Sequence, residues 1–227
     1  PQDGSFNPAN NLIVQNNRLL SAQVRAIEQS RSKIIWVGTL QGMVKLQKNL
    51  KDFKLYRHDE DGKPLFGDNI IASIYYDSNN KNIWVGSWNE GLYIYNNNNE
   101  SVRNIDARSG LIPNNDVHSM FRDSEDRLWI GTQNGVAYYE FKTNRFIDFA
   151  SQINEANDIF KENRVYDITE DHKGNIWFGT RNGLHKYTGG KLESYYHTSY
   201  NSNSLNSNFI YDLLVDSDGQ IWIATDK

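Results

Sequence analysis

One short motif recurs five times along the chain, and this repeat constrains the fold more than any other feature. The copies are IIWVGTLQG from Ile34, NIWVGSWNEG from Asn82, RLWIGTQNG from Arg127, NIWFGTRNG from Asn175 and QIWIATDK from Gln220. Their tryptophans, at positions 36, 84, 129, 177 and 222, are 48, 45, 48 and 45 residues apart. Self-similarity at such a period is the mark of stacked repeat units, so the spacing predicts one structural unit for each copy.

The residues around each Trp predict four short strands in each unit. Aliphatic residues stand twelve and nine positions before the Trp, as in Val117 and Met120. Six positions before the Trp comes a turn residue: Asp in three copies, Ser30 in the first, and Asp77 displaced by an insertion in the second. An Asp followed by Gly, Asn or Ser favours a hairpin turn, and a Gly after the Trp strand marks a second turn. Two further β-rich runs follow that Gly in the first four copies.

Four antiparallel strands in about 46 residues, repeated, are typical of a β-propeller, because one such sheet needs neighbours to cover its faces. Kelch repeats would carry a Gly-Gly doublet in every copy and WD40 repeats a Trp-Asp pair; this chain has neither pattern. We therefore predict an all-β fold in a single domain. The expected blades span about 22–57, 69–105, 115–149 and 163–196, with a fifth blade split between 208–227 and 6–15. A five-blade ring closed by its termini and a piece of a larger, seven-blade ring both fit this arithmetic.

Composition excludes several classes of function. The net charge is −4 with no long Lys/Arg run, so we expect no nucleic acid partner. No apolar stretch is long enough to span a bilayer, and the chain has no cysteine for thiolate metal sites or a Cys nucleophile. The five histidines lack metal-ligand spacing, and the Asp-rich segments 59–62 and 216–219 lack the remaining ligands of a calcium loop. We expect no metal and no cofactor.

The repeated pattern of Asn, two aliphatic residues, Asp, a Gly- or Asn-containing turn, Ile-Trp-Ile-Gly-Thr and Asn-Gly-Leu resembles the two-component regulator propeller repeat. This resemblance implies a periplasmic sensor domain of a hybrid two-component system of Bacteroidetes, whose histidine kinase and inner-membrane helix would lie outside this chain. It departs from the pattern at Ala224, which replaces Gly, at Ser30, and in the lengthened loop at Trp88, Asn89 and Glu90. The repeat carries no information about the ligand.

Positions that recur in every copy are explained by building the blade, so candidate site residues are those that differ at equivalent positions. In a propeller the loop before the innermost strand and the loop between the second and third strands open on one face. The residues that vary there are Trp88, Asn89, Arg181, Arg164, Tyr166, His118, Asp116, Arg25, Tyr211 and Gln133, with Gln41 in the first copy. Aromatic faces that stack on sugars, amides for hydroxyls, and Arg for a uronate or sulfate suit a carbohydrate.

We therefore expect a non-catalytic sensing domain that recognises an oligosaccharide or another small extracellular ligand and signals to a kinase. Its other expected partners are further domains of the same receptor and a second copy in a homodimer, with membrane contact only through parts outside this chain. The alternatives are a propeller lyase or hydrolase resembling the streptogramin lyases, for which His118 beside Asp116 is the candidate pair, and a protein interaction platform.

Overall fold

The computed structural model describes residues 23–30, 34–40, 42–46, 54–56, 62, 64–67 and 70–227. The first blade contains β1 (Val24–Gln29), β2 (Ile35–Thr39), β3 (Gly42–Leu46) and β4 (Lys54–Tyr56). The second contains β5 (Ile71–Asp77), β6 (Asn82–Ser87), β7 (Leu92–Asn96) and β8 (Val102–Ile105). The third contains β9 (Val117–Arg122), β10 (Arg127–Thr132), β11 (Val136–Glu140) and β12 (Arg145–Asp148). The fourth contains β13 (Val165–Glu170), β14 (Ile176–Thr180), β15 (Gly183–Thr188) and β16 (Lys191–Tyr195), and the fifth sheet contains β17 (Ile210–Val215) and β18 (Ile221–Thr225).

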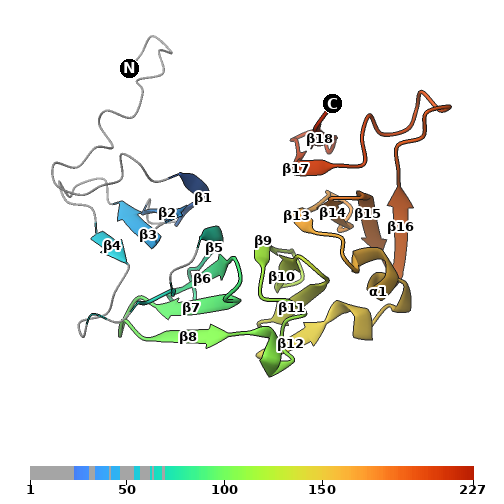
Figure 1. Ribbon diagram of the computed structural model, residues 1–227. Helices are drawn as coiled ribbons and strands as arrows, with labels where there is room; N and C mark the ends of the chain where they lie inside the picture. The colour runs from blue at the N-terminus through green and yellow to red at the C-terminus, as the bar shows by residue number, and fades with distance from the viewer. Residues whose placement is uncertain are drawn as a thin grey trace, which may run out of the picture.

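The blades follow one another around a common axis, which confirms the predicted all-β propeller fold. Within each sheet the strands are antiparallel and lie in chain order. Figure 1 shows the first strands of the five sheets, β1, β5, β9, β13 and β17, around the centre of an arc that is open between β17 and β1. The helix α1 (Asn154–Phe160) lies in the connection between the third and fourth blades, after the 3-10 turn η3 (Phe149–Ser151). A second 3-10 turn, η2 (Ala107–Ser109), connects the second and third blades.

Each of the first four repeated tryptophans packs against the next blade. Trp36 lies in one core cluster with the second blade, Trp84 with the third, Trp129 with the fourth, and Trp177 with the fifth sheet. The first three are almost completely buried. A large aromatic ring between two sheets supplies much of the apolar area that an isolated blade leaves uncovered, so the tryptophans hold neighbouring blades together.

The Gly two residues after each of the first four tryptophans allows the next blade to come close. A Cβ at Gly131 would lie 2.8 Å from Cγ1 of Val165, and one at Gly179 would lie 2.8 Å from Cγ2 of Ile210. Gly38 and Gly86 make the same contact with the first aliphatic residue of the following blade. These separations are below van der Waals contact, so a side chain at this position would push the blades apart.

The turn aspartates also hold the tryptophans. The Oδ2 atoms of Asp123, Asp171 and Asp216 accept the indole N–H of the Trp six residues later, at 2.7, 2.9 and 2.7 Å. The Oδ1 atoms accept backbone N–H groups of the turn. The first blade has Ser30 in place of the Asp, and in the second Asp77 stands one residue further from the Trp. In these two blades Nε1 of Trp36 and of Trp84 is buried without a hydrogen-bond partner among the described residues.

The two end sheets leave apolar side chains uncovered in the described part of the chain. Val24 and Ile27 on β1 are 51% and 67% exposed, whereas the equivalent Val117 and Ile168 inside the arc are buried. Trp222 on β18 is 60% exposed. The predicted pairing of segment 6–15 with the fifth sheet lies outside the described residues.

Candidate functional site

Backbone hydrogen bonds bring the two variable loops of each blade together at one end of the axis. The N–H of Trp88, in the loop after β6, donates to the carbonyl of Ile70, just before β5, at 3.0 Å. The same bond joins Gln133 to Asp116 at 3.0 Å and Arg181 to Arg164 at 2.9 Å. A fourth copy joins Leu40 to Gln23 in the first blade. The predicted site residues therefore lie on loops held side by side.

A β-bulge places one residue of each inner strand out of the ladder. The pairing shifts between Val165 and Asp167, which leaves Tyr166 unpaired with β14. The same shift falls in all five blades, and the residues at the unpaired position are Arg25, Ala72, His118, Tyr166 and Tyr211. Bulges commonly redirect a side chain beside a functional site. Four of these five residues belong to the predicted site.

Aromatic side chains from four blades form one contiguous run. The ring of Trp88 contacts His118 with centroids 5.7 Å apart, and His118 contacts Tyr166 at 6.3 Å. Tyr166 lies 5.9 Å from Tyr211 and 5.1 Å from Phe209, which also contact each other at 4.6 Å. These residues come from the second, third and fourth blades and the fifth sheet. Together with the two arginines described next, we call them the axial cluster. The cluster exists only when the blades are assembled.

Two arginines complete this axial cluster. The guanidinium carbon of Arg25, from β1, lies 5.6 Å from the Trp88 ring centroid, and that of Arg164 lies 5.8 Å from it. Arg164 is also 5.5 Å from the Tyr166 ring. Its Nε donates to Oε1 of Gln133 at 2.5 Å. Cation–π contacts with Trp are favourable, so the ring of Trp88 positions both cations.

His118 is neutral at physiological pH. Burial, and next the positive charge of Arg164, lower its pKa to about 4, while Asp116 only partly opposes them. Its Nε2 atom and the indole Nε1 of Trp88 are buried without hydrogen-bond partners among the described residues. Buried polar atoms that lack partners are uncommon in folded proteins. Both atoms lie in the middle of the axial cluster.

The remaining predicted residues lie at the edge of the cluster. Asp116 accepts the N–H of Asn89 through Oδ1 at 2.6 Å, which joins the third blade to the lengthened loop of the second. The side chains of Asn89 and Arg181 are exposed, and Arg181 is tied to the cluster through its backbone bond to Arg164. Gln41 lies outside the described residues. The structure thus gathers eight of the ten predicted side chains, and joins Asn89 and Arg181 to them through backbone N–H groups.

Sequence reasoning missed a second layer below the cluster. Asp167 and Asp212 occupy the position after the bulge on the last two inner strands, where the first three carry Ala26, Ser73 and Ser119. Asp167 accepts the N–H of Leu213 at 2.8 Å. Burial raises its pKa to about 7, and Asp212 adds to the rise. The ten predicted residues were chosen because they differ between equivalent positions of the blades. The same comparison would also have found Asp167 and Asp212.

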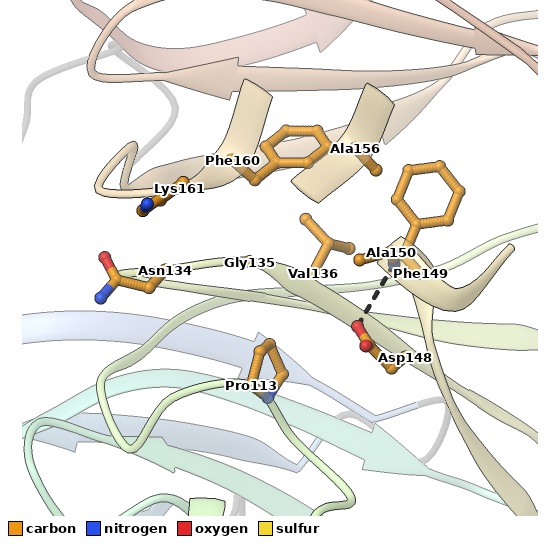
Figure 2. Close-up of a pocket in the computed structure, with 10 residues that line it drawn as sticks. All are labelled: Pro113, Asn134, Gly135, Val136, Asp148, Phe149, Ala150, Ala156, Phe160 and Lys161. Carbon is orange, nitrogen blue, oxygen red and sulfur yellow. Dashed lines mark hydrogen bonds between the residues drawn. The ribbon is translucent and has the colours of Figure 1, made fainter. Parts of the chain in front are cut away.

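A separate cleft of about 340 Å³ lies beside α1. Figure 2 shows Phe160 and Ala156 on one side of it and Val136 and Pro113 on the other, with the ring of Phe149 beside Ala156. Both phenylalanines and Ala156 belong to the core cluster of the third and fourth blades. None of the ten predicted residues lines this cleft.

Two negative findings concern the described ranges alone. Within them, no helix has the length and apolar character needed to cross a membrane. The same residues hold no cluster of three or more His, Asp or Glu side chains arranged to bind a metal ion.

Four segments of the chain match the two-component regulator propeller: residues 64–89, 111–134, 159–182 and 204–227. Each segment includes the inner strand and the Trp strand of one blade. A histidine kinase P4 of Formosa agariphila is 30% identical over 108 residues, which are 45% of this chain and 8% of that protein.

Solved structures with the same fold include the extracellular domain assigned to a hybrid two-component system of B. thetaiotaomicron. It is 21% identical with a TM-score of 0.73, over 90% of this chain and 27% of that one. PorZ of Porphyromonas gingivalis is 17% identical with a TM-score of 0.66, over 90% of this chain and 31% of that one. Virginiamycin B lyase of Staphylococcus aureus is 10% identical with a TM-score of 0.66, over 89% of this chain and 63% of that one. At these identities the likeness concerns the fold. Four of the five repeats of this chain, those of Trp84, Trp129, Trp177 and Trp222, therefore match the two-component regulator propeller repeat.

Proposed function

We propose that this chain is a non-catalytic, extracytoplasmic sensing domain that binds an oligosaccharide at the axial cluster and signals to a kinase elsewhere in its protein. One observation carries the proposal: aromatic, Arg and amide side chains converge at the mouth on positions that differ from blade to blade. The scaffold does not need those residue types there. Rings and amides at a rigid mouth suit a ligand with apolar faces and many hydroxyls.

The match to a two-component regulator propeller and the likeness to an extracellular sensor-system domain support this reading. Binding would produce a signal only if the ligand favours one arrangement of the receptor's domains over another. Because the axial cluster draws side chains from several blades, a ligand that contacts all of them favours one relative position of those blades.

A matched pair of tyrosines tests the site. Tyr211 is 51% exposed in the axial cluster, and Tyr200 is fully exposed in the connection before β17. We expect a binding oligosaccharide to raise the melting temperature of the protein. Tyr211→Ala should weaken binding several-fold by removing a stacking surface, and Tyr200→Ala should leave it unchanged. Equal loss in both variants, or no glycan that binds, would contradict the proposal.

A lyase is the second candidate, because neutral His118 has the protonation state of a general base and an Nε2 atom with no partner in the described structure. Oδ1 of its neighbour Asp116 accepts the N–H of Asn89, and no hydrogen bond joins the two side chains among the described contacts. Turnover of a glycan or macrolactone that is lost in His118→Ala would replace the sensing proposal with this one.

A further inference from the structure

Trp88 serves as a support for two cations. Both Arg25 and Arg164 lie within 6 Å of its ring centroid, the range in which cation–π attraction acts, and the edge of His118 contacts the same ring. Its indole nitrogen is buried. With these neighbours around it, Trp88 offers less free ring surface to a sugar than Tyr211 does. Its role is to hold guanidinium groups in place.

The held arginines keep donors available. Arg164 uses Nε on Gln133, which leaves both terminal nitrogens without a hydrogen-bond partner among the described residues. Arg25 uses one terminal nitrogen, Nη2, on Gln23 at 3.2 Å. The two terminal nitrogens of a guanidinium group match the oxygens of a carboxylate or sulfate in a bidentate contact. A guanidinium already fixed by a ring and an amide loses less freedom when it binds.

Neither of these two arginines pairs with a carboxylate among the described residues, a property they share with Arg103, Arg145 and Arg181 but not with the arginines of the outer turns. Arg108 forms an ion pair with Asp106, and Arg127 forms one with Asp123. No ion pair of Arg25 or Arg164 occurs within the described part of the chain. Two like charges near one ring repel each other, and a bound anion would reduce that repulsion. In the axial cluster the one carboxylate among the ten predicted residues, Asp116, already accepts the N–H of Asn89.

From these contacts we infer that the ligand of the axial cluster is an acidic saccharide, whose carboxylate or sulfate group is bound by Arg25 and Arg164 while Tyr211 stacks on a sugar ring. This inference rests on the proposed function and specifies its ligand class. It assigns charge recognition to one side of the cluster and ring stacking to the other, with His118 and Tyr166 between them.

Pairs of oligosaccharides that differ only in charge test the inference. The probes are short oligogalacturonates and their carboxyl-reduced counterparts, and sulfated galactan oligosaccharides and their desulfated counterparts. Titration calorimetry gives the Kd of each for the parent protein, Arg164→Gln, Arg25→Gln and the control Arg145→Gln, which changes an exposed Arg on β12. Thermal unfolding of each variant checks that it remains folded.

We expect an acidic probe to bind more tightly than its neutral partner, and more weakly as salt rises. Arg164→Gln should raise the Kd of the acidic probe about tenfold or more, because a charged bidentate contact is lost, and raise that of the neutral probe much less. The two pairs distinguish a carboxylate from a sulfate.

Other outcomes overturn the inference in separable ways. If the neutral probes bind as tightly as the acidic ones, or if Arg145→Gln weakens binding as much as Arg164→Gln does, charge recognition at Trp88 is wrong while the proposed function stands. If no saccharide of either kind binds, both fall.

Discussion

Replacing Asp123 by Ala tests the bond between turn and tryptophan. The side chain of Asp123 is completely buried and accepts four hydrogen bonds. Oδ2 accepts from Nε1 of Trp129 at 2.7 Å and from Nε of Arg127 at 2.6 Å. Oδ1 accepts the backbone N–H groups of Glu125 at 3.0 Å and of Arg127 at 2.8 Å. Ala removes both acceptor oxygens, and with them all four hydrogen bonds, and leaves a buried indole donor unsatisfied.

The expected loss follows from burial. A buried donor left without a partner costs about 1–3 kcal/mol, and the turn amides, which water reaches more easily, cost less. We therefore expect Asp123→Ala to lower the free energy of unfolding by about 3 kcal/mol. For a domain of this size that corresponds to a fall in Tm of about 6–12 °C.

The same motif at the end of the chain provides the control. Asp216 accepts the Trp222 indole N–H at 2.7 Å and two turn amides, but Trp222 is 60% exposed. Water can replace the lost acceptor there, so Asp216→Ala should cost clearly less. Urea unfolding followed by Trp fluorescence measures both variants. Equal losses, or a loss below about 1 kcal/mol in Asp123→Ala, would refute the reasoning from burial.

Two further substitutions test single residues: one adds a carboxylate beside a buried tryptophan, and the other removes a carboxyl group whose pKa is raised. Ser30→Asp restores the missing acceptor for the buried Nε1 of Trp36 and should raise Tm by a few degrees in a thermal unfolding scan; a lower Tm would show that this turn cannot place a carboxylate on the indole. Asp167→Asn removes a carboxyl group whose pKa in the folded protein, about 7, is higher than its usual 3.8. The folded parent protein therefore keeps this proton to a higher pH than the unfolded chain does, so it loses stability as the pH rises from about 4 to 7. The variant should therefore gain on the parent across that range in Tm measured against pH, and a constant difference would contradict this assignment.

The fold could be predicted from the sequence because the same residue pattern recurs in each blade. Apolar residues at fixed distances from Trp129 and Trp177 define the strands, and turn residues separate them. Counting strands also predicted which loops share one end of the axis, and backbone bonds such as that from Gln133 to Asp116 hold them there. The repeat reveals the scaffold because recurrence separates it from residues such as Trp88.

The bulge at the inner strands was not predicted. Nothing in the residues Arg25, His118 and Tyr166 indicates that the ladder shifts there, because these side chains share no turn-forming preference. The bond from turn aspartate to indole was missed for another reason. The turn alone explained why an Asp stands six residues before each Trp. That the folded hairpin also brings Oδ2 of Asp171 within hydrogen-bond distance of Nε1 of Trp177 is visible only in the structure.

The helix α1 was also missed, since it occurs once and a repeat cannot reveal a unique insertion. Its residues Ala156 and Phe160 are buried against the third and fourth blades, so tertiary packing rather than a long periodic pattern stabilises this short segment. The contacts of the arginines with Trp88 depend on side chains from three blades meeting in space, which no local pattern encodes.

The glycine beside each junction makes the blades interchangeable. Gly86 and Gly131 meet Val117 and Val165 without a side chain, so the first four blades present the same contact surface to the next blade whatever residues their loops carry. We therefore expect that a blade can be duplicated or exchanged with little change in its neighbours, while the residue at its bulge changes independently. The residue types of the axial cluster can therefore change without changing how the blades pack, and a new ligand preference requires new residues only at the inner ends of the strands.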